Sequence, residues 1–291
     1  MKSAGGKVTI FFLKAIAALP FGVLYAISDF SALLLYHVVR YRRRMVRRNL
    51  TDSFPEKSIA EIKSIEKRYY RFISDVMVET VKLLNISREK LSKRIEVLDY
   101  EEINNSIDEN RSVVIMLGHY ANWEWVQEIG YYFKDVYRGS IYRKMSNRLW
   151  DEVFLKIRSR WDLTLLPQKS TVKALLDPRH RPWIFGFIAD QRPKSGGHHY
   201  QTRFLNHDTQ FITGPEDIGT RVNAKFFYLD VERKQRGYYV LRFKKLKPAE
   251  DAHPYPYTRA FWSAFEQTIS RDVALWLWSH NRWRVPRNGR V

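Results

Sequence analysis

Short apolar runs alternate with helical stretches from Ser112 onward, and this alternation most restricts the fold of the 291-residue chain. Short runs of this kind, rich in β-branched and aromatic residues, are typical of buried strands. We expect strands at residues 112–117, 136–142, 163–166, 183–189, 224–231 and 238–243, and helices near 122–133, 147–160, 170–177 and 257–280. Strands that alternate with helices predict a single α/β domain, in which helices flank a central, mostly parallel or mixed sheet.

The N-terminal part of the chain is a long apolar stretch, residues 8–39, in which only Lys14 and Asp29 carry a formal charge. About 20 apolar residues are enough to cross a bilayer, and residues 8–28 reach that length. The cleavage-site pattern of a secretory peptide is missing, so we expect a membrane-anchoring helix that stays attached to the protein.

The apolar stretch continues into a basic run, residues 40–48, which holds six Arg. A basic cluster beside an apolar span is typical of the cytoplasmic side of a membrane and attracts anionic lipid. We therefore expect residues 1–48 to form a membrane anchor and residues 49–291 to form the main domain, on the cytoplasmic face of the cytoplasmic membrane. The alternative is a buried amphipathic helix followed by a solvated basic tail.

The charge balance says more about partners than about the fold. The chain has 50 Lys and Arg against 31 Asp and Glu, a net charge of +19, so the partner should be acidic. Nucleic acid, an anionic membrane surface, and an acidic carrier protein or phosphorylated substrate all meet that condition. The chain has no cysteine, which excludes a thiol nucleophile, a Cys-ligated zinc ion and disulfide bonds.

The strand expected at residues 112–117 runs into the sequence GHYANWEW, which contains His119 and, five residues later, Glu124. Strand ends of this kind are where α/β sheets bind ligands. Asn122 is a good N-cap, so Glu124 falls in the first turn of the next helix, where the helix dipole favours the ionised carboxylate. We expect Glu124 to orient His119, which would act as a general base on an external hydroxyl. The spacing alone occurs about once by chance in such a chain, so a hydrogen-bonded core histidine is the alternative.

Other segments make this signature more specific. GHYANWE, in which Ala121 replaces the usual glycine, resembles the GHxGNWE signature of the late acyltransferases of lipid A biosynthesis. These are the lauroyl and myristoyl acyltransferases, a branch of the lysophospholipid acyltransferase superfamily. The other matching segments follow in the same order along the chain: Tyr142-Arg143, KIRSR with Arg158 and Arg160, Asp190-Gln191, TRFLN, the TGP of Thr213 to Pro215, and WSHNRWR at residues 278–284.

The resemblance implies an enzyme, an acyltransferase that transfers acyl groups other than aminoacyl groups. Acyl carrier protein would be the donor, in preference to coenzyme A, and the acceptor would be a hydroxyl of a lipid A-type glycolipid precursor in the inner membrane. His119 would be the general base, with Glu124 as its partner. Guanidinium groups suit the phosphate of donor or acceptor, and the substrate-binding residues would be Tyr142, Arg143, Arg158, Asp190 and Gln191. For Asp190, a pairing with a neighbouring Arg is the alternative. No cofactor is implied.

Two further functions are compatible with parts of the sequence. An aminoacyl lipid or a lysophospholipid could replace the glycolipid acceptor, because the motifs address chemistry that these reactions share. A non-catalytic basic protein that binds membranes or nucleic acid is the competing class. It would need exposed stacking aromatics, yet the aromatic runs fall in strands that we expect to be buried, so we expect no nucleic-acid partner.

Two histidine-containing segments lie outside the main motif. His198, His199 and His207 match no metal signature in their spacing, so we expect no metal site. For His280, packing at the end of a terminal helix is a simpler account than a second catalytic group. The length of the transferred acyl chain depends on the depth of an apolar tunnel, which the sequence does not give.

Overall fold

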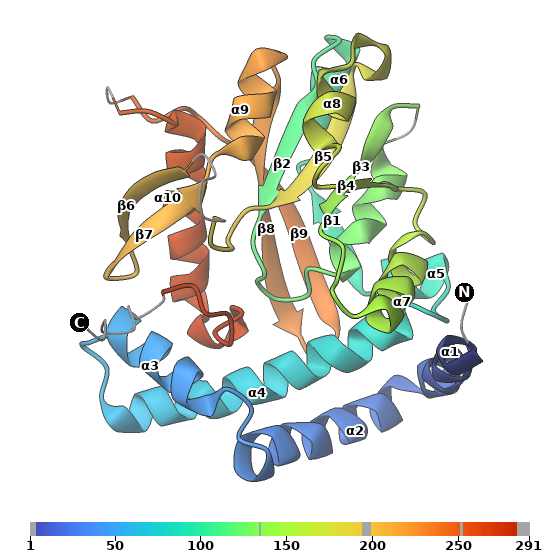
Figure 1. The fold of residues 1–291 in the computed structure, drawn as a ribbon, viewed down its shortest axis with the longest axis vertical. Helices are drawn as coiled ribbons and strands as arrows, with labels where there is room; N and C mark the ends of the chain where they lie inside the picture. Colours follow the sequence, from blue (N-terminus) through green and yellow to red (C-terminus); the bar gives the residue numbers. More distant parts are fainter. Residues whose placement is uncertain (1–3, 134, 194–198, 251–252, 284–291) are drawn as a thin grey trace, which may run out of the picture.

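A seven-stranded sheet forms the centre of the protein in a computed structural model that describes residues 4–133, 135–193, 199–250 and 253–283 (Figure 1). The strand order is β1-β9-β8-β2-β5-β3-β4. Strands β8, β2, β5, β3 and β4 are parallel, whereas β9 and β1 run in the opposite direction. The strands are β1 Ile95–Leu98, β2 Val113–Leu117, β3 Tyr137–Tyr142, β4 Thr164–Pro167, β5 Trp183–Ile188, β8 Lys225–Gln235 and β9 Tyr238–Lys245. The predicted α/β class and the six predicted strands are therefore confirmed.

Two features of the sheet structure were not predicted. Strand β1 has only four residues, one of them charged, so it gives a weak periodic signal. The hairpin of β6 (His199–Phe204) and β7 (His207–Ile212) lies outside the main sheet. Its two-residue turn uses Leu205 and Asn206, both at positive φ, and a Leu in that position is not a recognisable turn signal.

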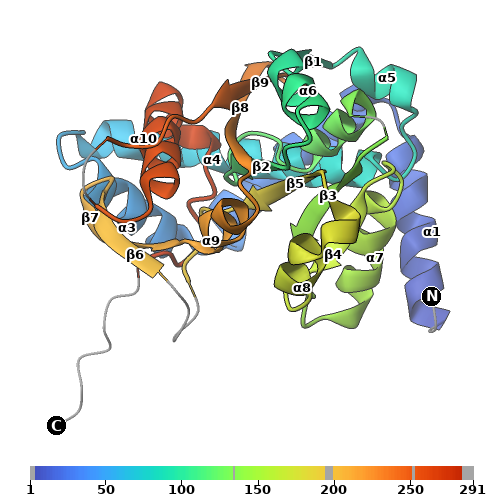
Figure 2. The same ribbon diagram turned by 90° about the horizontal axis from the view of Figure 1, so that it is seen from above.

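Helices surround the sheet, and Figure 2 shows α10 and the β6–β7 hairpin at one end of the molecule and α1 and α7 at the other. The longest helix, α4, begins with a complete capping box between Ser58 and Glu61. The α-helices are α1 Ala4–Ala18, α2 Phe21–Leu33, α3 Arg43–Ser53, α4 Ile59–Lys82, α5 Arg88–Ser92, α6 Glu101–Asp108, α7 Arg148–Arg158, α8 Thr171–Leu176, α9 Gly214–Arg221 and α10 Pro256–Arg271.

The N-terminal apolar stretch is divided, so the predicted single span at residues 8–28 is wrong. Helix α1 ends at Ala18 and α2 begins at Phe21, because Pro20 lacks a backbone N–H and cannot continue the preceding helix. Helix α2 continues into a π-helical turn, Leu34–Val38. Among the described residues, one helix, Phe21–Val38, is long and apolar enough to cross a membrane.

Two other helix predictions need correction. The segment predicted as a helix at 122–133 is a 3₁₀-helix, Trp125–Tyr132. The C-terminal helix ends at Arg271 rather than near residue 280, because Asp272 adopts an extended conformation and its side chain caps a short turn, Val273–Leu275. Consequently Trp278 and His280 lie in a non-helical tail instead of at a helix end.

Gly118, the residue between β2 and His119, lies against the buried ring of Phe265 in α10. A β-carbon at position 118 would come within 2.1 Å of that ring, and Phe265 is only 1% exposed. The close contact explains why this position needs glycine, since any side chain would displace a buried aromatic ring.

We predict that Gly118→Ala lowers the free energy of unfolding by about 1–3 kcal/mol, because the added methyl overpacks the core around Phe265. Thermal or urea unfolding followed by circular dichroism measures the change. Gly214→Ala is the matched control, since a β-carbon there meets no atom within 4 Å. Equal stability of the two variants would contradict the packing argument.

Candidate active site

The parallel pairing of β2 with β5 brings His119 and Asp190 together. Leu117 pairs with Ile188, and two residues later both chains leave the same edge of the sheet. The ring Nδ1 of His119 lies 2.6 Å from Asp190 Oδ1, and the backbone N–H of His119 donates to Oδ2 at 2.9 Å. One carboxylate therefore fixes both the backbone and the ring of His119, and leaves Nε2 on the other side of the imidazole.

Asp190 is itself held by the C-terminal tail. The Trp276 indole N–H donates to Asp190 Oδ2 at 2.8 Å, and an Arg282 N–H donates to the main-chain oxygen of Asp190. Burial raises the pKa of the Asp190 carboxyl group, but the interactions with His119 and Trp276 outweigh burial and hold that pKa below its usual range. Asp190 is therefore an anion that can stabilise a protonated imidazole.

The tail reaches this position through contacts that its sequence does not reveal. The Ala121 N–H donates to Leu275 O at 2.9 Å, and Arg282 is 4% exposed, with its guanidinium 4.5 Å from the centre of the Trp262 ring. Burial lowers the pKa of Arg282 to about 9, although Asp190 acts in the opposite direction. Trp276 and Arg282 were not predicted as site residues, and membership of Arg282 in the WSHNRWR motif is the signal that could have indicated it.

Glu124 lies beside this pair and has a different partner. Asn122 Oδ1 accepts from the backbone N–H groups of Glu124 and Trp125 at 3.1 and 3.0 Å, but the 3₁₀-helix begins at Trp125, so Glu124 is its N-cap residue and the predicted place of Glu124 in the first turn is wrong. The Glu124 carboxylate accepts from Arg158 Nη2 at 2.6 Å and from Nε at 3.1 Å. In this structure the carboxylate hydrogen-bonded to His119 is that of Asp190, whereas Glu124 holds Arg158, the last residue of α7.

A buried acid supports the loop that carries Glu124. Glu79 of α4 is fully buried and accepts from Asn122 Nδ2 at 2.6 Å and from the Tyr239 hydroxyl at 2.7 Å. Burial raises the pKa of Glu79, opposed by the hydrogen bonds from Tyr239, Tyr25 and Asn122. Sequence reasoning missed Glu79, because a polar residue inside an amphipathic helix gives no signal of a buried partner.

The remaining predicted residues lie around the same edge. Gln191 Nε2 is 3.3 Å from His119 Nε2. Tyr142 ends β3, and the exposed Arg143 follows it at the edge where β2 and β5 also end. His280 lines a small cavity together with His119, and burial lowers its pKa.

Of the three histidines His198, His199 and His207, only His207 has a side chain within the part of the structure that is described. His207 stacks on Trp283, with ring centres 3.8 Å apart, and its Nε2 lies 3.2 Å from the Ser53 hydroxyl. His198 lies outside the described residues. No group of three or more metal-ligating side chains occurs among those that are described.

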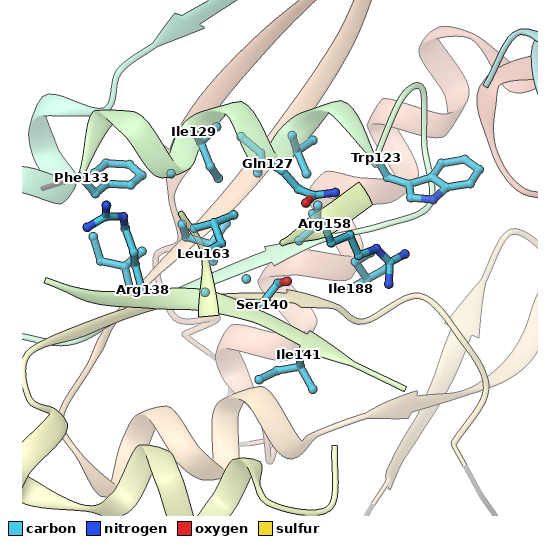
Figure 3. A pocket seen from close by; sticks show the side chains of 18 of the residues that line it. Trp123, Gln127, Ile129, Phe133, Arg138, Ser140, Ile141, Arg158, Leu163 and Ile188 are labelled. Carbon is cyan, nitrogen blue, oxygen red and sulfur yellow. The ribbon is translucent and has the colours of Figure 1, made fainter. Parts of the chain in front are cut away.

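An apolar pocket opens next to His119. Its empty volume, which includes space open to solvent, is about 730 Å³. Figure 3 shows Trp123 and Arg158 toward one end and Phe133 and Arg138 at the other. The Trp123 ring is 5.2 Å from the His119 ring, so the first end adjoins the imidazole. The walls are mostly aliphatic: Ile115, Leu117, Val126, Ile129, Ile141, Leu163, Ile184, Ile188 and Leu229.

A family comparison fits this geometry. The model of the family described as bacterial lipid A biosynthesis acyltransferase matches residues 3–285, nearly the whole chain. The chain belongs to that family. This lipid A acyltransferase therefore uses an acyl donor and a lipid acceptor, its family is membrane-associated, and Phe21–Val38 provides one candidate span. A search of curated proteins found no match.

The lowered pKa of Asp190 predicts a pH-dependent stability difference from the Asp190→Asn variant. A depressed carboxyl pKa contributes stability that is complete above the ordinary value of 3.8 and is lost as the pH falls further. We expect the wild-type acyltransferase to be more stable than Asp190→Asn by about 1–3 kcal/mol near neutral pH, and the gap to narrow below about pH 4.

Urea unfolding at several pH values measures this gap. Glu56→Gln is the control, because the Glu56 side chain is 62% exposed and should show almost no gap at any pH. A gap for Asp190→Asn that stays constant down to about pH 3 would mean that the carboxylate is not stabilised as described.

Proposed function

We propose that this acyltransferase moves a fatty acyl group from acyl carrier protein to a hydroxyl of a lipid A-type glycolipid precursor, at the cytoplasmic face of the inner membrane. The observation that carries the proposal is the His119–Asp190 pair beside an apolar pocket. Because Asp190 engages Nδ1, the opposite nitrogen, Nε2, is available as a general base. The amide of Gln191 now lies against Nε2, where the acceptor hydroxyl would bind.

The proposed reaction is a direct transfer. His119 Nε2 takes the proton of the acceptor hydroxyl while the hydroxyl oxygen attacks the thioester carbonyl carbon. The tetrahedral intermediate then collapses, the carbon–sulfur bond breaks, and the imidazolium returns its proton to the thiolate. Asp190 stabilises the imidazolium through Nδ1, as the acid of a catalytic triad does.

We assign Glu124 and Arg158 to the donor side of the reaction. Glu124 remains a proposed catalytic residue, because its carboxylate holds the Arg158 guanidinium at the end of the pocket that adjoins His119. Burial lowers the pKa of Arg158, but Glu124 raises it further, so the group stays cationic. A fixed cation at this point suits the developing oxyanion or the donor phosphate.

Charge on the surface supports acyl carrier protein as the donor. Exposed cations follow β3 at the edge where the site lies: Arg143, Lys144 and Arg148. An acidic carrier would be attracted to them and to the net charge of +19. In this proposal residues 1–48 serve as the membrane anchor and residues 49–291 as the acyltransferase domain, which faces the cytoplasm.

We predict that His119→Ala lowers acyl transfer by about 10²–10⁴-fold, because the general base is lost. Transfer of labelled acyl chains from acyl carrier protein to a bacterial lipid extract measures the effect. His180→Ala is the control, since His180 lies before β5, at the opposite edge of the sheet, and should keep its activity. Full activity of a folded His119→Ala protein would refute the mechanism.

The pocket should hold the acyl chain, and Gly186 of β5 lies in its wall. A β-carbon at position 186 has its nearest neighbours at 3.9 Å, so a side chain there enters the pocket without a clash. We predict that Gly186→Val shifts the donor preference toward shorter acyl chains by about tenfold, and that Leu163→Ala shifts it toward longer ones. Competition between acyl carrier proteins of different chain length measures both shifts. An equal loss of transfer activity with acyl chains of every length would show that the acyl chain binds outside this pocket.

A further inference from the structure

Helix α2 turns both apolar and polar residues toward the protein. Leu24, Ser28 and Ala32 are buried, and Tyr25 and Asp29 make polar contacts there. Its outward face is apolar, and these side chains are 38–61% exposed: Val23, Ile27, Phe30, Leu33 and Leu34. An exposed apolar face of this size needs an apolar cover.

Polar contacts fix α2 along the length of α4, which lies beside it in Figure 1. The Tyr25 hydroxyl donates to Glu79 at 2.9 Å, and the Ser28 hydroxyl donates to Asp75 at 2.6 Å. Arg236, from the β8–β9 hairpin, donates to both Asp29 and Asp75. If α2 separated from α4, Asp75 and Glu79 would lose these hydrogen-bond partners. The loss of partners from buried carboxylates destabilises a protein.

The helix pair as a unit cannot cross a bilayer. Helix α4 carries exposed cations, Lys63, Lys67 and Arg71, along its solvent side. If α2 crossed the membrane while it remained packed on α4, these charges would enter the hydrocarbon region, at a cost of about 2.5–3.5 kcal/mol each.

The basic run after α2 is partly used inside the protein. Arg43 and Arg47 donate to the buried carboxylate of Glu66, and Arg42 donates to the main-chain oxygen of Ser279. Arg40 and Arg44 are exposed beside the apolar face. An apolar face followed along the chain by exposed cations matches an anionic lipid surface.

We infer that Phe21–Val38 lies flat in one leaflet, with its outward face in the headgroup boundary, and does not cross the membrane. Apolar side chains of α1 extend this surface: Phe11, Phe12 and Ile16. This placement rests on the proposed function, in which the enzyme acts at a lipid surface, and it specifies how the protein binds that surface.

The chain has no cysteine, so single nitroxide labels can be placed without background. We propose labels at Val23, Ile27, Phe30 and Leu34, with Asp108 at the far end of the molecule as a reference. Depth is measured by paramagnetic relaxation on vesicles of phosphatidylethanolamine and phosphatidylglycerol. A flat helix predicts four similar depths, about 5–10 Å into the boundary, with the reference label in water.

Two results would overturn the inference. A helix that crosses would place Ile27 and Phe30 deepest, near the bilayer centre about 15 Å from either boundary, and its two ends shallow. If the labels stay in water while the enzyme is active on vesicles, the outward face of α2 is covered by protein and not by lipid. Acyl transfer by the same labelled variants is measured separately, so failure of the proposed function and failure of the flat placement are distinguishable.

A charge on the outward face gives a second readout. Phe30→Glu should lower vesicle binding about tenfold or more, because the variant lacks the aromatic side chain that would be buried in the lipid. Val172→Glu is the matched control, because Val172 is 49% exposed but lies on α8, away from α2, and should bind normally. Equal binding of both variants would also overturn the inference.

Discussion

The parallel pairing of β2 with β5 is the constraint on which the rest of the site depends. It fixes where two chain segments, 71 residues apart, leave the sheet, and it sets His119 against Asp190. The C-terminal tail then packs over Asp190 through Trp276 and Arg282. A single strand register therefore determines which nitrogen of the imidazole lies against Asp190.

Helix α4 connects helix α2 with the candidate site. Its buried Glu79 accepts from Tyr25 of α2 on one side and from Asn122 of the loop that carries Glu124 on the other. Asn122 in turn caps the segment that carries Glu124. The same buried acid thus contacts both α2 and the loop that carries Glu124. Buried polar networks of this kind favour one arrangement, because each member needs all its partners.

Much of the fold could be read from the sequence, because strand and helix periodicities are local. All six expected strands formed, and the Asn122 side chain accepts from the Glu124 backbone N–H as expected. The β6–β7 hairpin could not be predicted, since its turn residues, Leu205 and Asn206, are held at positive φ by the fold around them. The C-terminal tail could not be placed either, because nothing local indicates that Trp276 packs onto Asp190.

The sequence by itself determined the α/β class, the apolar N-terminal segment and the motif residues, all of which depend on neighbours in the chain. Only the tertiary structure decided that Asp190 lies on His119 while Glu124 holds Arg158, because partner choice depends on strand register and not on spacing. It also decided which face of α2 is turned outward. An apolar pattern indicates burial, but whether protein or lipid covers the surface depends on where the polar partners lie.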